Sequence, residues 1–341
     1  MEPSDLLTLE AGVLRLLRSV RADDLTTLFG SKRVVYLVDY PAAGILAARS
    51  ITLASPMDTT KKHALLQRLP PKSFILSPGV IPPDARRNGG RWQSGLRLDE
   101  AFHLPVVDVA YIRRFFAAFQ ILLFLIRNRG KYDAILCYNS YAHTLIPAVV
   151  AARLLAVPLY IDWEDDYRLA PGNILTRILW PVARKYSSGG IAVNQRMLEP
   201  GMQNWLVVEA YCDLGYAADL EFSLRPGMRL LFSGTLDAIR GAHLVPDLVR
   251  RLSDAIGTFT LDITGGGVLS DEIRAIADAD PRIRFHGFVE KQQLEKLIHD
   301  ADACLVLQDP GQAFSNGSFP SKIHLYAEHR KPVLMLRANG S

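Results

Sequence analysis

The sequence predicts an α/β protein made of two doubly wound, Rossmann-like domains. Short apolar runs alternate with segments of helical periodicity, which is typical of parallel sheets with right-handed crossovers. The alternation breaks off over residues 209–227 and then restarts, which indicates two sheets rather than one. The length of 341 residues agrees with this, because a domain holds ~150 residues.

The first half is predicted to contain an N-terminal helical extension, residues 1–30, and one domain, residues 31–215. Leucines at helical spacing predict an amphipathic helix over residues 5–20. Residues 82–100 are polar and glycine-rich, which is typical of an exposed loop. The predicted strands are 32–40, 73–79, 132–139, 157–163 and 190–195, and the predicted helices are 45–50, 109–131, 140–156 and about 173–187.

The second domain is assigned to residues 216–341. Ligands of doubly wound sheets bind at the carboxyl ends of the strands, and we expect the two domains to face each other across a cleft. The predicted strands are 228–234, 258–265, 282–287, 303–308 and 331–337, and the predicted helices are about 242–256, 270–279, 291–299 and 321–328.

Composition limits the classes of function. Apolar residues make up 49% of the chain and charged residues 22%, which excludes wholesale disorder and fibrous classes. The net charge of +4 lies in residues 1–221, which carry 25 basic and 21 acidic side chains, whereas residues 222–341 carry 14 of each. This mild excess suits a phosphate-bearing ligand or an anionic membrane surface. It is too weak for duplex DNA, so no nucleic-acid partner is expected.

Cysteine usage and the N-terminus predict a cytoplasmic protein. Cys137, Cys212 and Cys304 are far apart and odd in number, so they form neither a zinc motif nor a disulfide framework. The first residues include acids and no basic leader, unlike a signal peptide. No apolar run approaches the ~20 residues that a transmembrane helix needs.

Residues 109–129 raise the question of membrane contact. Arginines flank a run of phenylalanines and leucines in this segment. A basic amphipathic helix of this kind can lie in the interface of an anionic bilayer at the inner face of the cell membrane. A buried crossover helix has a similar sequence, so both interpretations stay open.

An acidic cluster follows the strand predicted over residues 157–163. Four carboxylates at the end of a strand can act as a base, hold sugar hydroxyls or bind a divalent cation. They also suit the N-terminus of a solvated helix, where acids are favourable. The candidate catalytic residues are Asp162, Glu164, Asp165 and Asp166.

Four strand-to-helix turns in the second domain can hold a nucleotide. Backbone N–H groups at helix starts suit phosphate, and glycines allow a ligand to approach the backbone. A lysine in the first helical turn is unfavourable against the helix dipole unless an anion is present. Ordinary structural turns explain the same motifs. The candidate binding residues are Gly234, Arg240, Gly241, Gly265, Gly267, Phe288, Val289, Ser321 and Lys322.

Taken in order, these turns resemble those of GT-B glycosyltransferases of the family 4 kind, which use nucleotide-activated sugars. The resemblance covers roughly residues 31–337. Its strongest matches are FSGTLDAIRG (232–241), LDITGGG (261–267), IRFHGFVEKQQLEKLIHDADACLVL (283–307) and FPSKIHLYAEHRKPVL (319–334). Residues 132–167 resemble the acceptor-side segment of that family.

The resemblance implies the GT-B fold and transfer of a sugar from a nucleotide-diphosphate-sugar to a lipid-linked or polysaccharide acceptor. Retention of configuration and a role in cell-surface glycan biosynthesis are also implied. The donor is a substrate, so no cofactor and no metal are expected. Arg240 and Lys322 match the pair that holds the donor diphosphate, and Ser321 matches a phosphate contact. The glycines match close-approach positions, Phe288 and Val289 lie beside the base, and the acidic loop 162–166 faces the donor sugar.

The sequence also departs from that family. Gly234 is followed by Thr235 where an arginine is usual, and Gly317 and Leu325 stand where two glutamates are usual. No further strand–helix units follow residue 337, so the second domain is expected to be incomplete. Two alternatives stay open: a degenerate or truncated protein that binds a nucleotide or a partner, and a metal-dependent transferase centred on residues 162–166.

Overall fold

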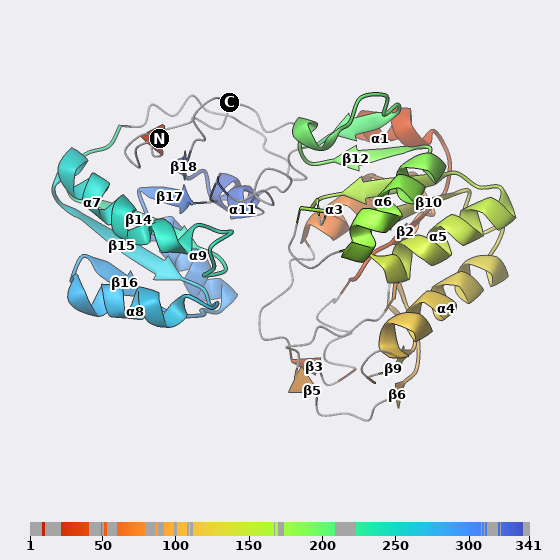
Figure 1. Ribbon diagram of the computed structural model, residues 1–341, viewed down its shortest axis with the longest axis horizontal. Helices are drawn as coiled ribbons and strands as arrows, with labels where there is room; N and C mark the ends of the chain where they lie inside the picture. Colours follow the sequence, from red (N-terminus) through yellow and green to blue (C-terminus); the bar gives the residue numbers. More distant parts are fainter. Residues whose placement is uncertain are drawn as a thin grey trace. The chain divides into compact units, whose positions relative to one another are not determined.

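The computed structural model divides the chain into two compact units. One comprises Arg18–Tyr211, and the other joins Met1–Leu17 to Cys212–Ser341. We call them the inserted unit and the terminal unit. Both are α/β (Figure 1). The structure describes residues 9–10, 22–40, 49, 51–52, 60–78, 86–87, 92–98, 101–107, 109, 112–166, 168–169, 174–208, 223–307, 309, 311, 320 and 322–336.

The inserted unit is built on an eight-stranded sheet of order β13-β12-β11-β10-β2-β4-β8-β7, parallel except for the β7–β8 pair. Its central strands are apolar at nearly every position because both faces of the sheet are covered. The strands are β2 (Val34–Leu37), β4 (Phe74–Ser77), β7 (Leu96–Leu98), β8 (Ala101–His103), β10 (Ala134–Tyr138), β11 (Leu159–Trp163), β12 (Gly189–Ala192) and β13 (Trp205–Val207). Two small antiparallel pairs join β3 (Ile51–Thr52) to β5 (Arg86–Arg87) and β6 (Trp92–Gln93) to β9 (Val106–Val107).

Helices cover both faces of this sheet. On one face, α4 (Ile112–Arg127), α5 (Ala142–Leu155) and α6 (Ile174–Tyr186) lie side by side (Figure 1). Ile121 of α4 and Ala148 of α5 belong to the core on that face. On the other face, α1 (Ala22–Phe29) and α3 (Thr60–Arg68) supply Phe29 and Leu65 to a second core. A short 3-10 helix, η2 (Gln195–Met197), precedes β13.

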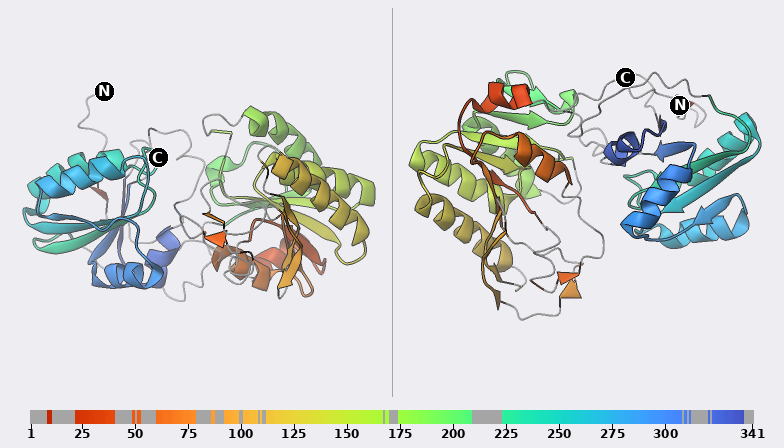
Figure 2. Two further views of the ribbon diagram at one scale, coloured as in Figure 1. Left: turned by 90° about the horizontal axis from the view of Figure 1, so that it is seen from below. Right: turned by 180° about the vertical axis from the view of Figure 1, so that it is seen from behind.

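The terminal unit is a second doubly wound layer structure. Its sheet has the order β1-β18-β17-β14-β15-β16, and all neighbours are parallel except β1 and β18. The strands are β1 (Leu9–Glu10), β14 (Met228–Ser233), β15 (Phe259–Thr264), β16 (Ile283–Phe285), β17 (Ala303–Val306) and β18 (Val333–Leu336). Figure 2 (left) shows helices above and below the sheet. They are η3 (Ala242–Leu244), α7 (Val245–Ile256), α8 (Ser270–Ala279), α9 (Lys291–Asp300) and α11 (Lys322–Glu328).

Within the described residues, the predicted alternation of strands and helices is confirmed from residue 32 onward, apart from several short elements. Residues 82–100 were expected to be an exposed loop but contain β5, β6 and β7. Strands β3, β8, β9 and β13 and helix α3 were not predicted. The helix expected over residues 5–20 is wrong at Leu9–Glu10, which form a strand, and the helix expected up to Ser50 lies outside the described residues.

Among the described residues, no helix combines the length and the apolar character needed to cross a bilayer.

Candidate functional site

Asp162 is a buried anchor of the inserted unit. It lies near the carboxyl end of β11 and is fully buried. The phenol of Tyr36, on β2, donates a hydrogen bond to Asp162 Oδ2. Because a buried carboxylate needs hydrogen-bond donors, this contact accounts for an acid inside an otherwise apolar strand.

Asn139 holds the acidic loop at the carboxyl edge of the sheet. It follows β10 with a φ of +50°, and its backbone N–H donates to the carbonyl of Asp162 at 2.7 Å. Its side-chain oxygen accepts from the backbone N–H groups of Glu164 (2.8 Å) and Asp165 (3.1 Å). The buried Asn139 Nδ2 has no hydrogen-bond partner in the described part of the chain. Glu164 and Asp165 are therefore fixed in place and partly exposed.

Tyr138, Asp39 and Lys62 complete this edge. The Tyr138 hydroxyl donates to Glu164 Oε2 at 2.8 Å, and burial, with the nearby carboxylates, holds the pKa of Tyr138 well above its usual value. Lys62 Nζ donates to the carbonyl of Asp39 at 2.7 Å and lies 4.9 Å from the centre of the Tyr138 ring. Burial raises the pKa of Asp39 to about 6, against the opposing effect of Lys62. A carboxyl group of this pKa can exchange protons near neutral pH.

Asp166 is committed to a different network. The Arg168 guanidinium donates one hydrogen bond to each carboxylate oxygen of Asp166, and both donor–acceptor distances are 2.7 Å. The same guanidinium bonds Glu199 and stacks on Trp163 and Trp180, 4.9 and 4.7 Å from their ring centres. Asp166 is buried. Of the four acids predicted for catalysis, Glu164 and Asp165 are thus partly exposed to solvent. Asp162 and Asp166 are buried and hydrogen-bonded to Tyr36 and Arg168.

Metal binding was one of the predicted alternatives for this acidic loop. Within the described ranges, no three His, Cys, Asp or Glu side chains are arranged to hold a metal ion.

In the terminal unit, the turns after β14 and β15 are joined at the carboxyl edge of the sheet. Gly234 N–H donates to Thr264 O at 3.1 Å, and Leu236 N–H donates to Gly266 O at 3.0 Å. A Cβ atom on Gly265 would lie 1.8 Å from Gly234 O, and one on Gly267 would lie 2.4 Å from Leu236 O. The fold itself therefore requires both of these glycines.

The remaining glycines include one that packing requires and two that it does not. A Cβ atom on Gly241 would lie 1.6 Å from Leu307 O, so Gly241 is also required by packing. Gly234 and Gly266 face open space, with nothing within 4 Å of an added Cβ. A ligand can therefore approach the backbone at these two positions, where the Gly234 N–H is already donated to Thr264 O.

Arg240 is the cation beside these turns. Its backbone N–H donates to Asp237 Oδ1 at 2.7 Å. Within the residues that the structure describes, its guanidinium makes no hydrogen bond or ion pair, so the five donors are available to an anion. Lys322 is the first residue of α11, and Ser321 lies outside the described residues. Phe288 is exposed, whereas Val289 packs against the core formed by α9 and β17.

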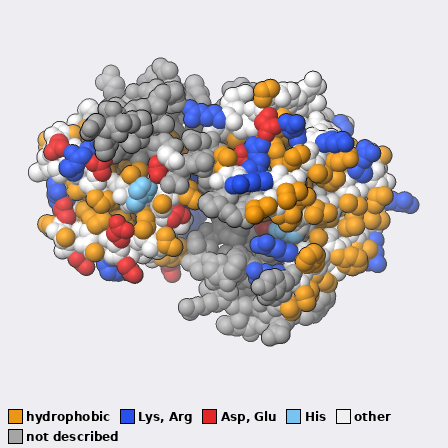
Figure 3. Space-filling view, viewed as in Figure 1, with side chains coloured by type: hydrophobic (Ala, Val, Ile, Leu, Met, Phe, Trp, Pro, Cys, Tyr) orange, Lys and Arg blue, Asp and Glu red, His pale blue; other side chains and the backbone are white. Residues whose placement is uncertain are grey.

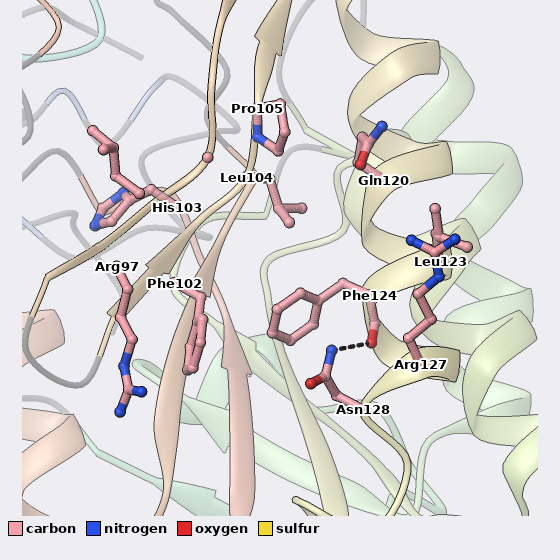
Figure 4. Close-up of a pocket in the computed structure, with 12 residues that line it drawn as sticks. Arg97, Phe102, His103, Leu104, Pro105, Gln120, Leu123, Phe124, Arg127 and Asn128 are labelled. Carbon is pink, nitrogen blue, oxygen red and sulfur yellow. Dashed lines mark hydrogen bonds between the residues drawn. The ribbon is translucent and has the colours of Figure 1, made fainter.

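A separate pocket of about 430 Å³ lies between β8 and α4. Figure 4 shows Phe102 and Phe124 turned toward each other in its lining, with ring centres 5.3 Å apart, and Arg97 and Arg127 at its margin. The His103 ring points away from it (Figure 4). Its lining includes none of the residues predicted for the site.

Comparison with solved structures identifies the fold. No family model and no curated protein matches the sequence. The chain is similar to HepE from Anabaena in complex with UDP, with a TM-score of 0.51 and 12% identity over 88% of this chain and 79% of that chain. This similarity shows that the chain has the GT-B fold.

Two further alignments are looser. The lipopolysaccharide outer core galactosyltransferase WaaB aligns with a TM-score of 0.49, 12% identity, and coverage of 88% of this chain and 79% of that one. UDP-N-acetylglucosamine 2-epimerase from Rickettsia bellii gives a TM-score of 0.44, 13% identity, and coverage of 89% and 78%.

Proposed function

We propose that this chain is a glycosyltransferase that moves a sugar from a nucleotide-diphosphate-sugar to a lipid-linked or polysaccharide acceptor. The observation that carries the proposal is the Arg240 guanidinium, which has no partner among the described residues. Arg240 belongs to the turn after β14, which contacts the turn after β15, and the two turns have open space at Gly234 and Gly266. Such a cation next to accessible backbone suits a diphosphate. The GT-B fold supports the same conclusion.

The proposed chemistry is the displacement of a diphosphate. The bond between the anomeric carbon and the diphosphate oxygen breaks, and the nucleoside diphosphate leaves with the electron pair. The acceptor hydroxyl forms the new bond and gives up its proton. Arg240 and Lys322 stabilise the charge that develops on the leaving group, Ser321 contacts the phosphate, and the Phe288 ring lies against the base.

We propose retention of configuration, in which the departing phosphate itself takes the acceptor proton. In this mechanism Glu164 and Asp165 hold sugar hydroxyls, because they are the acids of the loop that keep exposed surface. Such a reaction belongs to the biosynthesis of cell-surface glycans at the inner face of the membrane.

The first test is thermal unfolding of the whole chain with a panel of nucleoside diphosphates. A ligand at 100 times its Kd adds ~2.7 kcal/mol to the free energy of unfolding. We expect one nucleotide to raise Tm, and Arg240→Ala and Lys322→Ala to abolish the rise. Arg284→Ala and Lys296→Ala remove exposed cations from β16 and α9 and should leave it unchanged. If no nucleotide raises Tm, the proposal is wrong.

A second candidate is a protein that binds the nucleotide without transferring a sugar. Leu325, which packs partly into the core around α9 and α11, occupies a position where the resembled family carries a glutamate. This candidate predicts a nucleotide-dependent rise in Tm with no release of nucleoside diphosphate from any nucleotide-sugar, whereas a transferase releases it in the presence of an acceptor.

A further inference from the structure

Three helices of the inserted unit turn large apolar side chains toward solvent. A helix that covers a sheet normally exposes polar residues on its outer side. On α4, α5 and α6 many of the outer positions are instead apolar, and several of these apolar side chains are between 39% and 80% exposed. We call this surface the outer helical face, and its main members are Phe115, Phe119, Leu154, Ile174, Ile178 and Val182.

These exposed side chains do not contribute to the core. The inner side of α4 packs Ile121 and Leu125 on the sheet, and α5 packs Ala148 there. On α6, Trp180 is buried against Trp163, with ring centres 3.9 Å apart. Each helix thus has one apolar side that covers the sheet and a second that covers nothing in the described chain. Exposed apolar patches of this kind mark interaction surfaces.

The charge on the three helices selects the partner. Together they carry seven Lys and Arg residues and no Asp or Glu. Arg114, Arg127 and Arg153 are exposed among the apolar side chains. Arg177 and Arg184 are exposed too, although each also bonds a protein group, the carbonyl of Arg168 and the Glu199 carboxylate. Figure 3 shows hydrophobic and Lys/Arg side chains gathered over the region of these helices.

A positively charged apolar face matches one partner best. A second copy of the same face would bring two sets of cations together, which is unfavourable. A bilayer containing anionic lipids supplies negative head groups for the basic side chains and an apolar layer for Phe115, Phe119 and Leu154.

We propose that the outer helical face binds peripherally to the surface of an anionic bilayer, with α4, α5 and α6 lying in the interface. The proposal enlarges the membrane contact predicted for residues 109–129 from one helix to three. The proposed membrane surface is distinct from the turns after β14 and β15, where the nucleotide-sugar is proposed to bind. The proposal does not depend on transferase activity.

Flotation with vesicles tests this directly. The purified full-length chain is mixed with vesicles of phosphatidylcholine alone or with added phosphatidylglycerol, at two salt concentrations. We expect binding to the anionic vesicles only, weakened by salt. The pair Phe115→Ser and Phe119→Ser should lower the partition coefficient at least about tenfold. Each of Arg114→Gln and Arg153→Gln should lower it about fivefold.

Matched controls come from the terminal unit. Val268→Ser removes an exposed apolar side chain, and Lys291→Gln with Lys296→Gln removes two exposed cations. These should float like the unaltered protein, and every variant should keep its nucleotide-dependent Tm shift. Three results would overturn the proposal: equal binding to neutral vesicles, unchanged binding in the face variants, or a dimer that the face variants dissociate.

Discussion

At the scale of single residues, two acids of the inserted unit couple proton binding to stability: Asp39 beyond the carboxyl end of β2, and Asp133 at the amino end of β10. The pKa of Asp39 is raised to about 6 by burial, whereas Arg33 lowers the pKa of Asp133 to about 2 through hydrogen bonds. These two acids respond to pH in opposite ways. A raised pKa in the folded state stabilises the protein fully below about pH 4, and that contribution is lost as the pH rises through about 6.

Asp39→Asn should therefore gain stability relative to the unaltered chain as the pH rises. We expect the difference in the free energy of unfolding to change by about 2–3 kcal/mol between pH 4 and pH 7. Urea denaturation at four pH values measures it. Asp133→Asn is the control, because the proton of Asp133 titrates below this range and its difference should stay constant. A constant difference for Asp39→Asn would contradict the assigned pKa.

The partners that hold the acidic loop in place could not be predicted from the sequence. Asp162 was identified because it ends a predicted strand, but its partner Tyr36 lies 126 residues away. Asn139 likewise becomes a neighbour of the loop, and Lys62 a neighbour of Asp39 and Tyr138, only when β2, β10 and β11 align. The available signal was a polar residue within two positions of the end of a buried strand: Asp39 after β2 and Asn139 after β10. Chain position alone does not say which of these meet.

At the scale of elements, the turn after β15 requires glycine because it packs closely against the turn after β14. Gly265 has a φ of +137°, and an added Cβ would lie 1.8 Å from Gly234 O. Gly265→Ala should lower the free energy of unfolding by about 2–4 kcal/mol. Gly266→Ala, where the Cβ meets nothing within 4 Å, should leave it unchanged or raise it by up to about 1 kcal/mol. Thermal and urea unfolding compare the two variants. Equal effects would show that the two turns are not in contact.

Elements of ordinary length were predictable, and short ones were not. The runs that became β10, β11, β14 and β15 are apolar and flanked by helical periodicity, so pattern alone identifies them. β7 and β8 have three residues each, too few to display a period, and β7 lies within the polar, glycine-rich stretch of residues 82–100. α1 lies next to the predicted helix 5–20, yet Leu25 and Phe29 pack into the core of the inserted unit. Leucine spacing over residues 5–20 therefore does not locate α1, whose packing depends on tertiary contacts.

At the scale of the whole molecule, the inserted unit has everything needed to fold alone. Among the residues that the structure describes, those that form its two cores all belong to the inserted unit. We expect a fragment of residues 18–211 to unfold cooperatively in urea. All four tryptophans of the chain lie in this fragment, and Trp163 and Trp180 are buried. Its fluorescence should therefore be blue-shifted when folded. A red-shifted spectrum without a cooperative transition would contradict independent folding.

The pairing of β1 with β18 has a consequence for how the protein is made. Leu9 and Glu10 leave the ribosome early, but their partners Leu336 and Met335 are added more than three hundred residues later. At ~5–20 residues per second, that interval lasts roughly 15–65 s. The whole inserted unit is synthesised during this wait, while the first strand of the other sheet has no partner. The pairing of β1 with β18 can therefore form only after the inserted unit and the other strands of the terminal sheet have been synthesised.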